Sequence, residues 1–104
     1  MLQVLLNLEV FGMRPQQAVE APRFATYSFP DSFYPHESHP GLVCVEARFP
    51  EATREGLAAR GHTVQMWHEW EPKAGAVCLS RRDPATDLRE AAADPRRESY
   101  ALGW

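Results

Sequence analysis

The sequence lacks the features that membrane-spanning proteins and charge-driven nucleic-acid-binding proteins require. Its 104 residues include 11 basic and 14 acidic side chains, which gives a net charge of −3 at pH 7. A chain with this weakly acidic balance cannot bind phosphates by charge alone, so we expect no nucleic-acid partner. No apolar run approaches the roughly 20 residues of a membrane span, so we expect no transmembrane helix.

Cysteine is also scarce, because the chain contains only Cys44 and Cys78. Two cysteines are too few for a disulfide framework, and their spacing fits no zinc motif. Each lies in an apolar run, LVCVEA or GAVCLS, so both are predicted to be buried free thiols. The N-terminal residues MLQVLLNLEV carry no basic side chain and do not resemble a signal peptide. The length suits one small domain.

The segment 2–11 is nearly all apolar and is predicted to form a helix. Gln3 and Asn7 would lie one turn apart, while leucines and Phe11 would cover most of the remaining surface. A helix that is apolar over so much of its surface belongs inside a larger body. The alternation of apolar and polar residues over 6–10 leaves a strand as the alternative. Gly12 is expected to end the helix.

The rest of the chain alternates between predicted helices and strands. Pro15 suits the first position of a short helix that ends before Pro22. A further helix is predicted over 50–60, because proline and glutamate favour its start and Gly61 can close it. Their composition predicts strands at 23–29, 42–49, 63–67, 75–80 and 88–92. This order of elements predicts mixed α+β or layered α/β architecture.

A proline-rich loop over 30–41 contains His36, Glu37 and His39, which could together ligate a metal ion. They do not have the spacing of ligands on one helix face. A solvated loop is the simpler interpretation, so we expect no tight zinc site and no cofactor.

Other candidate groups also have structural interpretations. His62 follows the end of a predicted helix, where it can interact with exposed carbonyls. Trp67 and Trp70 flank a loop that could bind a ligand or simply pack. The two cysteines have no basic neighbours that would activate a thiolate. The sequence contains no G-x-S-x-G motif, phosphate-binding loop or dinucleotide fingerprint, so no catalytic residue is predicted from its motifs.

Two proline-containing corners are better determined. Ala21-Pro22-Arg23 lies between a predicted helix and a strand, and Asp94-Pro95-Arg96 opens the C-terminal tail. Proline fixes each turn, and the arginine that follows offers a planar set of donors. We therefore predict that Arg23, Asp94 and Arg96 are structural locks, meaning residues whose ion pairs or hydrogen bonds fix a turn.

Motifs along the whole chain resemble the γ-glutamyltransferase family. In order, they are Leu5-Leu6-Asn7, Phe11-Gly12-Met13, the segment PQQAVEAPRF at 15–24, LAARGHTV at 57–64, AAADPRR at 91–97 and YALGW at 100–104. Each motif is short, but their order and spacing together make the resemblance specific.

The resemblance implies an N-terminal-nucleophile hydrolase with a layered αββα fold. In that family a precursor cleaves itself, and the new N-terminal threonine attacks a γ-glutamyl amide and passes the acyl group to water or an amino acid. The resemblance places this chain in the last half of the small subunit. The nucleophile, the substrate-binding residues and the oxyanion glycines then lie before Met1, so no catalytic or substrate-binding residue is assigned. The loop 30–41 and the Trp67–Trp70 region resemble a bacterial subgroup of uncertain substrate.

We therefore expect residues 1–104 to form a single C-terminal segment of such a small subunit, with mixed-sheet strands and covering helices. Its partner would be the N-terminal portion of the same enzyme, or a second copy bound through the helix 2–11. One alternative is a stand-alone α+β interaction module without enzymatic function. A third is a small metal-binding protein that uses His36, Glu37 and His39.

Overall fold

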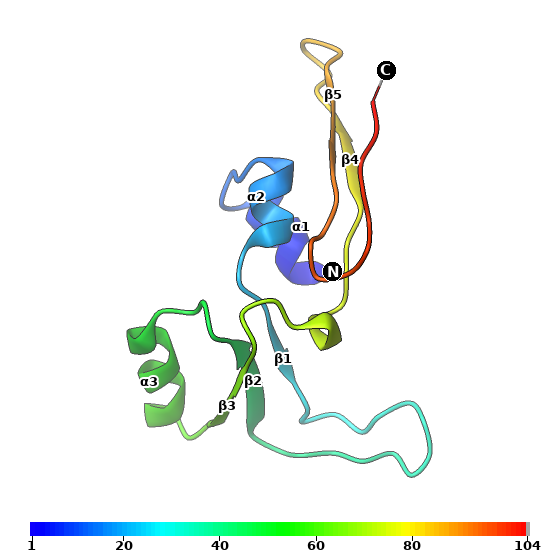
Figure 1. The fold of residues 1–104 in the computed structure, drawn as a ribbon. Helices are drawn as coiled ribbons and strands as arrows, with labels where there is room; N and C mark the ends of the chain where they lie inside the picture. The colour runs from blue at the N-terminus through cyan, green and yellow to red at the C-terminus, as the bar shows by residue number, and fades with distance from the viewer. Residues whose placement is uncertain (104) are drawn as a thin grey trace. The chain divides into compact units, whose positions relative to one another are not determined.

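The computed structural model describes residues 1–103, which form two compact units (Figure 1). One unit combines Met1–Ala21 with the residues from Gly75 onward, and the other is the continuous stretch Pro22–Ala74. Both contain helices and strands, so the predicted α+β class is confirmed. Trp104, the last residue of the YALGW motif, lies outside the described residues. No helix within residues 1–103 has the length and apolar character needed to cross a membrane.

The discontinuous unit begins with two helices, α1 (Leu2–Glu9) and α2 (Pro15–Glu20). The helix predicted at 2–11 is confirmed over Leu2–Glu9, and the strand alternative for this segment is wrong. Gly12 follows α1 and has a φ angle of +63°, a conformation that favours glycine. Pro15 occupies the first turn of α2, where its missing N–H would have no helical partner.

A hairpin of β4 (Leu79–Arg82) and β5 (Arg89–Ala92) completes this unit, with Leu79 paired to Ala92. The prediction that a strand starts at Gly75 was wrong. The backbone N–H of Val77 donates to the Asp94 carboxylate instead of to a neighbouring strand. Pairing therefore begins only at Leu79.

A small core joins the helices to the hairpin. Its buried members are Val4, Ala18, Val19 and Ala92, and partly buried apolar side chains pack around them. Because Val4 is the only buried residue of α1, most of that helix's apolar surface faces outward. The exposed apolar residues of the segment include Leu2 at 67%, Leu5 at 54%, Leu6 at 41% and Phe11 at 69%.

The continuous unit contains a three-stranded sheet with the order β1-β2-β3. Its strands are β1 (Phe24–Thr26), β2 (Leu42–Glu46) and β3 (Thr63–Trp67). β1 is antiparallel to β2, whereas β2 and β3 are parallel. The helix α3 (Glu51–Ala59) packs against β3 and supplies the crossover that a parallel pair requires.

The central strand β2 carries most of this unit's buried apolar surface, at Val43, Cys44 and Val45. Residues 27–41 form the expected long loop between β1 and β2. A short 3-10 helix, η1 (Pro72–Ala74), follows β3. The bounds predicted for β3 are confirmed, whereas β1 and β2 are shorter than predicted.

The two cysteines differ in their environments. Cys44 is 3% exposed on the central strand, as predicted. Cys78 is exposed, so the prediction that both thiols are buried was wrong. The physical reason is the late start of β4, which leaves Cys78 in the unpaired segment before the strand.

We expect a thiol reagent near neutral pH to modify Cys78 quickly and Cys44 slowly. Burial raises the pKa of the Cys44 thiol, although the charge of Lys73 acts in the opposite direction. A raised pKa reduces the fraction of the thiol present as the reactive thiolate, and burial also restricts access of the reagent. A colorimetric thiol assay should show a fast and a slow phase. Cys78→Ser should remove the fast phase, and a fast phase surviving in that variant would contradict the assignment.

Candidate functional site

Asp94 and Arg96 form a buried ion pair. Arg96 Nη1 lies 3.0 Å from Asp94 Oδ1, and both side chains are fully buried. The backbone N–H of Arg96 also donates to Oδ1, and that of Val77 donates to Oδ2, each at 3.1 Å. Three donors on one carboxylate offset much of the cost of removing it from water.

Arg96 also binds the end of helix α2. Its Nη1 donates to the Val19 carbonyl at 2.8 Å, and its Nη2 donates to the Ala21 carbonyl at 2.9 Å. Carbonyls at a helix C-terminus have no partners within the helix, and a positive charge there is favourable. Arg96 therefore joins α2 to the segment that follows β5.

The third predicted lock, Arg23, is buried but lies in the other unit. Its backbone N–H donates to Glu46 Oε2 at 2.9 Å, and its carbonyl accepts from the Glu46 N–H at 3.0 Å. Its guanidinium donates to the Ala74 carbonyl at 3.4 Å. The structure therefore brings Asp94 and Arg96 together, and it places Arg23 beside Glu46 and Ala74.

Glu46 is the centre of a hydrogen-bond network, and it was not among the residues predicted from the sequence. Its side chain is fully buried at the end of β2. Oε1 accepts from the Glu71 N–H at 3.0 Å, and Oε2 accepts from Arg23 N and from Arg48 Nη2, the latter at 3.0 Å. An acid in an apolar run with an arginine two residues later was the available signal.

Arg48 extends the Glu46 network to the loop after β3. Its Nε donates to the Glu69 carbonyl at 2.8 Å, and its guanidinium carbon lies 3.6 Å from the centroid of a Trp70 ring. A cation over an aromatic face is a favourable contact. Trp70 therefore has the packing role that was one of its two predicted interpretations.

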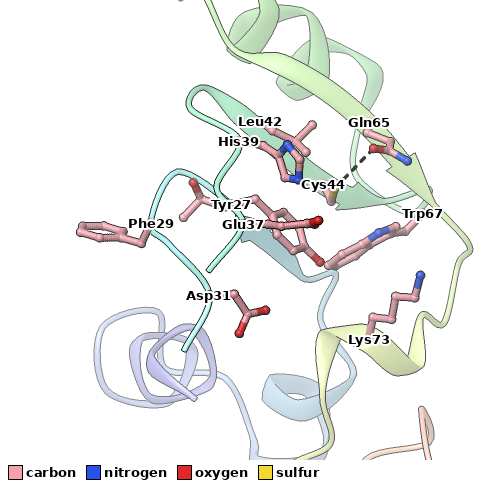
Figure 2. Close-up of a pocket in the computed structure, with 11 residues that line it drawn as sticks. Tyr27, Phe29, Asp31, Glu37, His39, Leu42, Cys44, Gln65, Trp67 and Lys73 are labelled. Carbon is pink, nitrogen blue, oxygen red and sulfur yellow. Dashed lines mark hydrogen bonds between the residues drawn. The ribbon is translucent and has the colours of Figure 1, made fainter. Parts of the chain in front are cut away.

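A cavity of about 440 Å³ lies in the continuous unit, on the side of the sheet shown in Figure 2. The residues that line it are Thr26, Tyr27, Phe29, Asp31, Glu37, His39, Leu42, Cys44, Gln65, Trp67 and Lys73. Tyr27 and Trp67 meet edge to face, with ring centroids 6.5 Å apart. Apolar rings and charged side chains thus share one concave surface, which is typical of small-molecule sites.

The environment of the cavity makes the Tyr27 phenol harder to ionise. Partial burial raises the pKa of its phenol, and nearby negative charge from Cys44, Glu71 and Asp31 raises the pKa further. Like any tyrosine at neutral pH, Tyr27 keeps its hydroxyl proton and can donate a hydrogen bond. On the neighbouring strands, the Cys44 thiol lies 3.9 Å from Gln65 Oε1.

The structure does not bring His36, Glu37 and His39 together as a ligand set. His36 Nδ1 lies 2.8 Å from the Asp31 carbonyl, whereas Glu37 and His39 line the cavity. Across residues 1–103, no three His, Cys, Asp or Glu side chains are grouped so that they could hold a metal ion. His62 lies just beyond α3, and its N–H donates to the Leu57 carbonyl at 3.2 Å.

The strands and covering helices are those of a segment of the layered αββα fold of N-terminal-nucleophile hydrolases. Residues 1–104 match the model of the Gamma-glutamyltranspeptidase family along their whole length. The chain therefore belongs to the γ-glutamyltranspeptidase family, as the motif resemblance implied.

Three relatives illustrate the match. The chain is 32% identical over 103 residues to the glutathione hydrolase-like YwrD proenzyme of Bacillus subtilis (strain 168), a match that covers 96% of this chain and 18% of that protein. The structure of LmbA2991HD has a TM-score of 0.84 and 38% identity, over 91% of this chain and 17% of that one. The cephalosporin acylase of Bacillus halodurans has a TM-score of 0.80 and 29% identity, over 98% of this chain and 17% of that one.

These relatives are much longer than the chain. It spans about a fifth or less of each of them. The match thus defines the family and the fold of this segment.

We expect Asp94→Ala to lower the free energy of unfolding by about 3–5 kcal/mol, because Arg96 would remain buried without its acid. For a chain of this size, such a loss lowers the melting temperature by more than about 10 °C. Thermal melts followed by circular dichroism measure the change.

Glu98→Ala is the matched control, because Glu98 is exposed in the same tail and its loss should be nearly silent. If Asp94→Ala does not fold, Asp94→Asn provides a milder test. An amide has one acceptor oxygen for three donors, so its melting temperature should still fall clearly. Melting temperatures equal to that of the parent for both Asp94 variants would show that Asp94 is not a structural lock.

Proposed function

We propose that the chain is a structural segment of a γ-glutamyltransferase-like enzyme that transfers or hydrolyses γ-glutamyl or related amide acyl groups. The observation that carries this proposal is the family match over residues 1–104, combined with the small share of each relative that the chain spans. The catalytic threonine and the oxyanion donors would belong to another part of that enzyme.

The hydrogen bonds of two buried acids support a structural role for this chain. The carboxylates of Asp94 and Glu46 accept hydrogen bonds from backbone amides and arginines of the same unit. Acids held in this way are poor candidates for proton transfer, because their oxygens are occupied by donors of the fold itself. Their contribution would be to hold strands and helices in place.

The class of chemistry is supported by the relatives. One is named as glutathione hydrolase-like and another as a cephalosporin acylase, and both names describe cleavage of an amide bond. These two names point to different substrates, so the proposal extends only to acyl transfer or hydrolysis at an amide. The mechanism would use an activated hydroxyl as the nucleophile.

The outward face of α1 supports a partner in the same enzyme. Leu2, Leu5 and Leu6 are exposed next to Phe11 and form an apolar surface of a kind that soluble monomers rarely leave uncovered. We propose that it packs against the N-terminal portion of the same enzyme, and that a second copy of the chain takes that place when this portion is absent.

We expect the chain alone to release no p-nitroaniline from a γ-glutamyl anilide above a boiled control. Without the nucleophile and the oxyanion donors, neither acyl transfer nor hydrolysis has its main sources of rate. Activity that co-purifies with the chain and is inhibited by a γ-glutamyl affinity label bound to it would overturn this part of the proposal.

The DNA sequence upstream of the Met1 codon can distinguish the enzyme-segment hypothesis from the hypothesis of a stand-alone module. An in-frame stretch that encodes a threonine nucleophile and a Gly-Gly pair would support the segment. A start signal with no such stretch would favour the non-enzymatic interaction module.

We also expect the chain alone to self-associate through α1. Burying apolar surface is worth about 25 cal/mol per Å², which favours association of exposed leucines. Sedimentation velocity should show oligomers, and the double variant Leu2→Gln/Leu5→Gln should shift them towards monomer. Leu88→Gln is the control, because Leu88 is as exposed as Leu2 but lies on the hairpin connection. A parent chain that stays monomeric at high concentration would contradict this expectation.

A further inference from the structure

The cavity in Figure 2 has no part in the structural role proposed above. All of the residues that line it belong to the continuous unit. Its volume of about 440 Å³ lies in the range of sites that hold small organic molecules. It therefore needs an explanation of its own.

One part of the cavity is aromatic. The rings of Tyr27 and Trp67 are perpendicular, at 90°, and Leu42 adds aliphatic surface nearby. Figure 2 shows both rings lying against the same space, with the Cys44 thiol beside them. A planar or aliphatic group of a ligand would find favourable packing here.

The cavity also carries charges of both signs. Lys73, the only lysine of the chain, lies on one side of it, and Glu37 lies on the loop that forms another side. Among the described residues, neither side chain forms an ion pair or a side-chain hydrogen bond. The ammonium and the carboxylate are therefore both available to a ligand.

We propose that this cavity binds a small zwitterion with an aromatic or apolar body. The ligand carboxylate pairs with Lys73, its ammonium pairs with Glu37, and its body packs against Tyr27 and Trp67. A simple anion would leave Glu37 unmatched and a simple cation would leave Lys73 unmatched, which lowers the affinity of either relative to a zwitterion. The proposal rests on the geometry of the cavity and not on the acyl-transfer chemistry.

The test uses L-phenylalanine as the probe and ligand-observed saturation-transfer NMR as the readout, which also works on self-associated protein. Two analogues each lack one charge: 3-phenylpropionate has no ammonium, and phenethylamine has no carboxylate. We expect L-phenylalanine to bind at least about tenfold more tightly than either analogue, a difference that one charge-assisted contact can supply.

Two variants assign the charges. Lys73→Met should make L-phenylalanine and phenethylamine bind equally, because the partner of the ligand carboxylate is gone. Glu37→Gln should make L-phenylalanine and 3-phenylpropionate bind equally. The controls are Arg81→Met and Glu98→Gln, which remove exposed charges from the other unit and should leave all three affinities unchanged.

Three results would overturn the proposal. The first is no saturation transfer to L-phenylalanine from folded protein, verified by circular dichroism. The second is equal binding of all three molecules, which would indicate contact with the rings alone. The third is a preference for L-phenylalanine that persists in both Lys73→Met and Glu37→Gln. A failure of any kind here leaves the enzyme-segment proposal untouched, because that proposal is tested by the coding region and the anilide assay.

Discussion

The carboxylate of Asp94 is the contact on which the discontinuous unit depends. It gathers the N–H of Val77, the N–H of Arg96 and the Arg96 guanidinium, and through Arg96 it reaches the last carbonyls of α2. The apolar core of this unit has only four fully buried members among the described residues, so it offers limited hydrophobic stabilisation. A buried ion pair by itself contributes little to the free energy of unfolding. The buried carboxylate is nevertheless costly if its hydrogen-bond donors are missing.

The continuous unit also contains a buried carboxylate that accepts hydrogen bonds from distant parts of the chain. Glu46 ends the central strand and receives donors from residues that precede β1 and follow β3. Hydrogen bonds from backbone amides depend on backbone position and not on neighbouring side chains, so they specify the path of the chain closely. Each unit is thus organised by one buried acid whose partners come from distant parts of the sequence.

Local signals in the sequence predicted the helices and strands well, but they predicted hydrogen-bond partners that are distant in the sequence poorly. Proline acts through its own backbone, so Pro15 correctly predicted the start of α2, whereas α1 ends at Glu9, three residues before Gly12. The same reasoning predicted that Arg23, Asp94 and Arg96 are held at turns. It could not identify Glu46, whose burial depends on amides more than 20 positions away. Cys78 was misplaced for a related reason, since a hydrogen bond to Asp94 delays the start of β4.

The discontinuity of the first unit has a consequence for biosynthesis. A chain that leaves the ribosome N-terminus first presents α1 and α2 long before Arg96, which is 77 positions beyond its partner Val19. The continuous unit has all its residues available earlier and can complete its sheet during this interval. Val4, Ala18 and Val19 would meanwhile lack Ala92, the hairpin member of their buried core. Premature termination before Arg96 would therefore leave the beginning of this segment, and not only its end, without its proper packing.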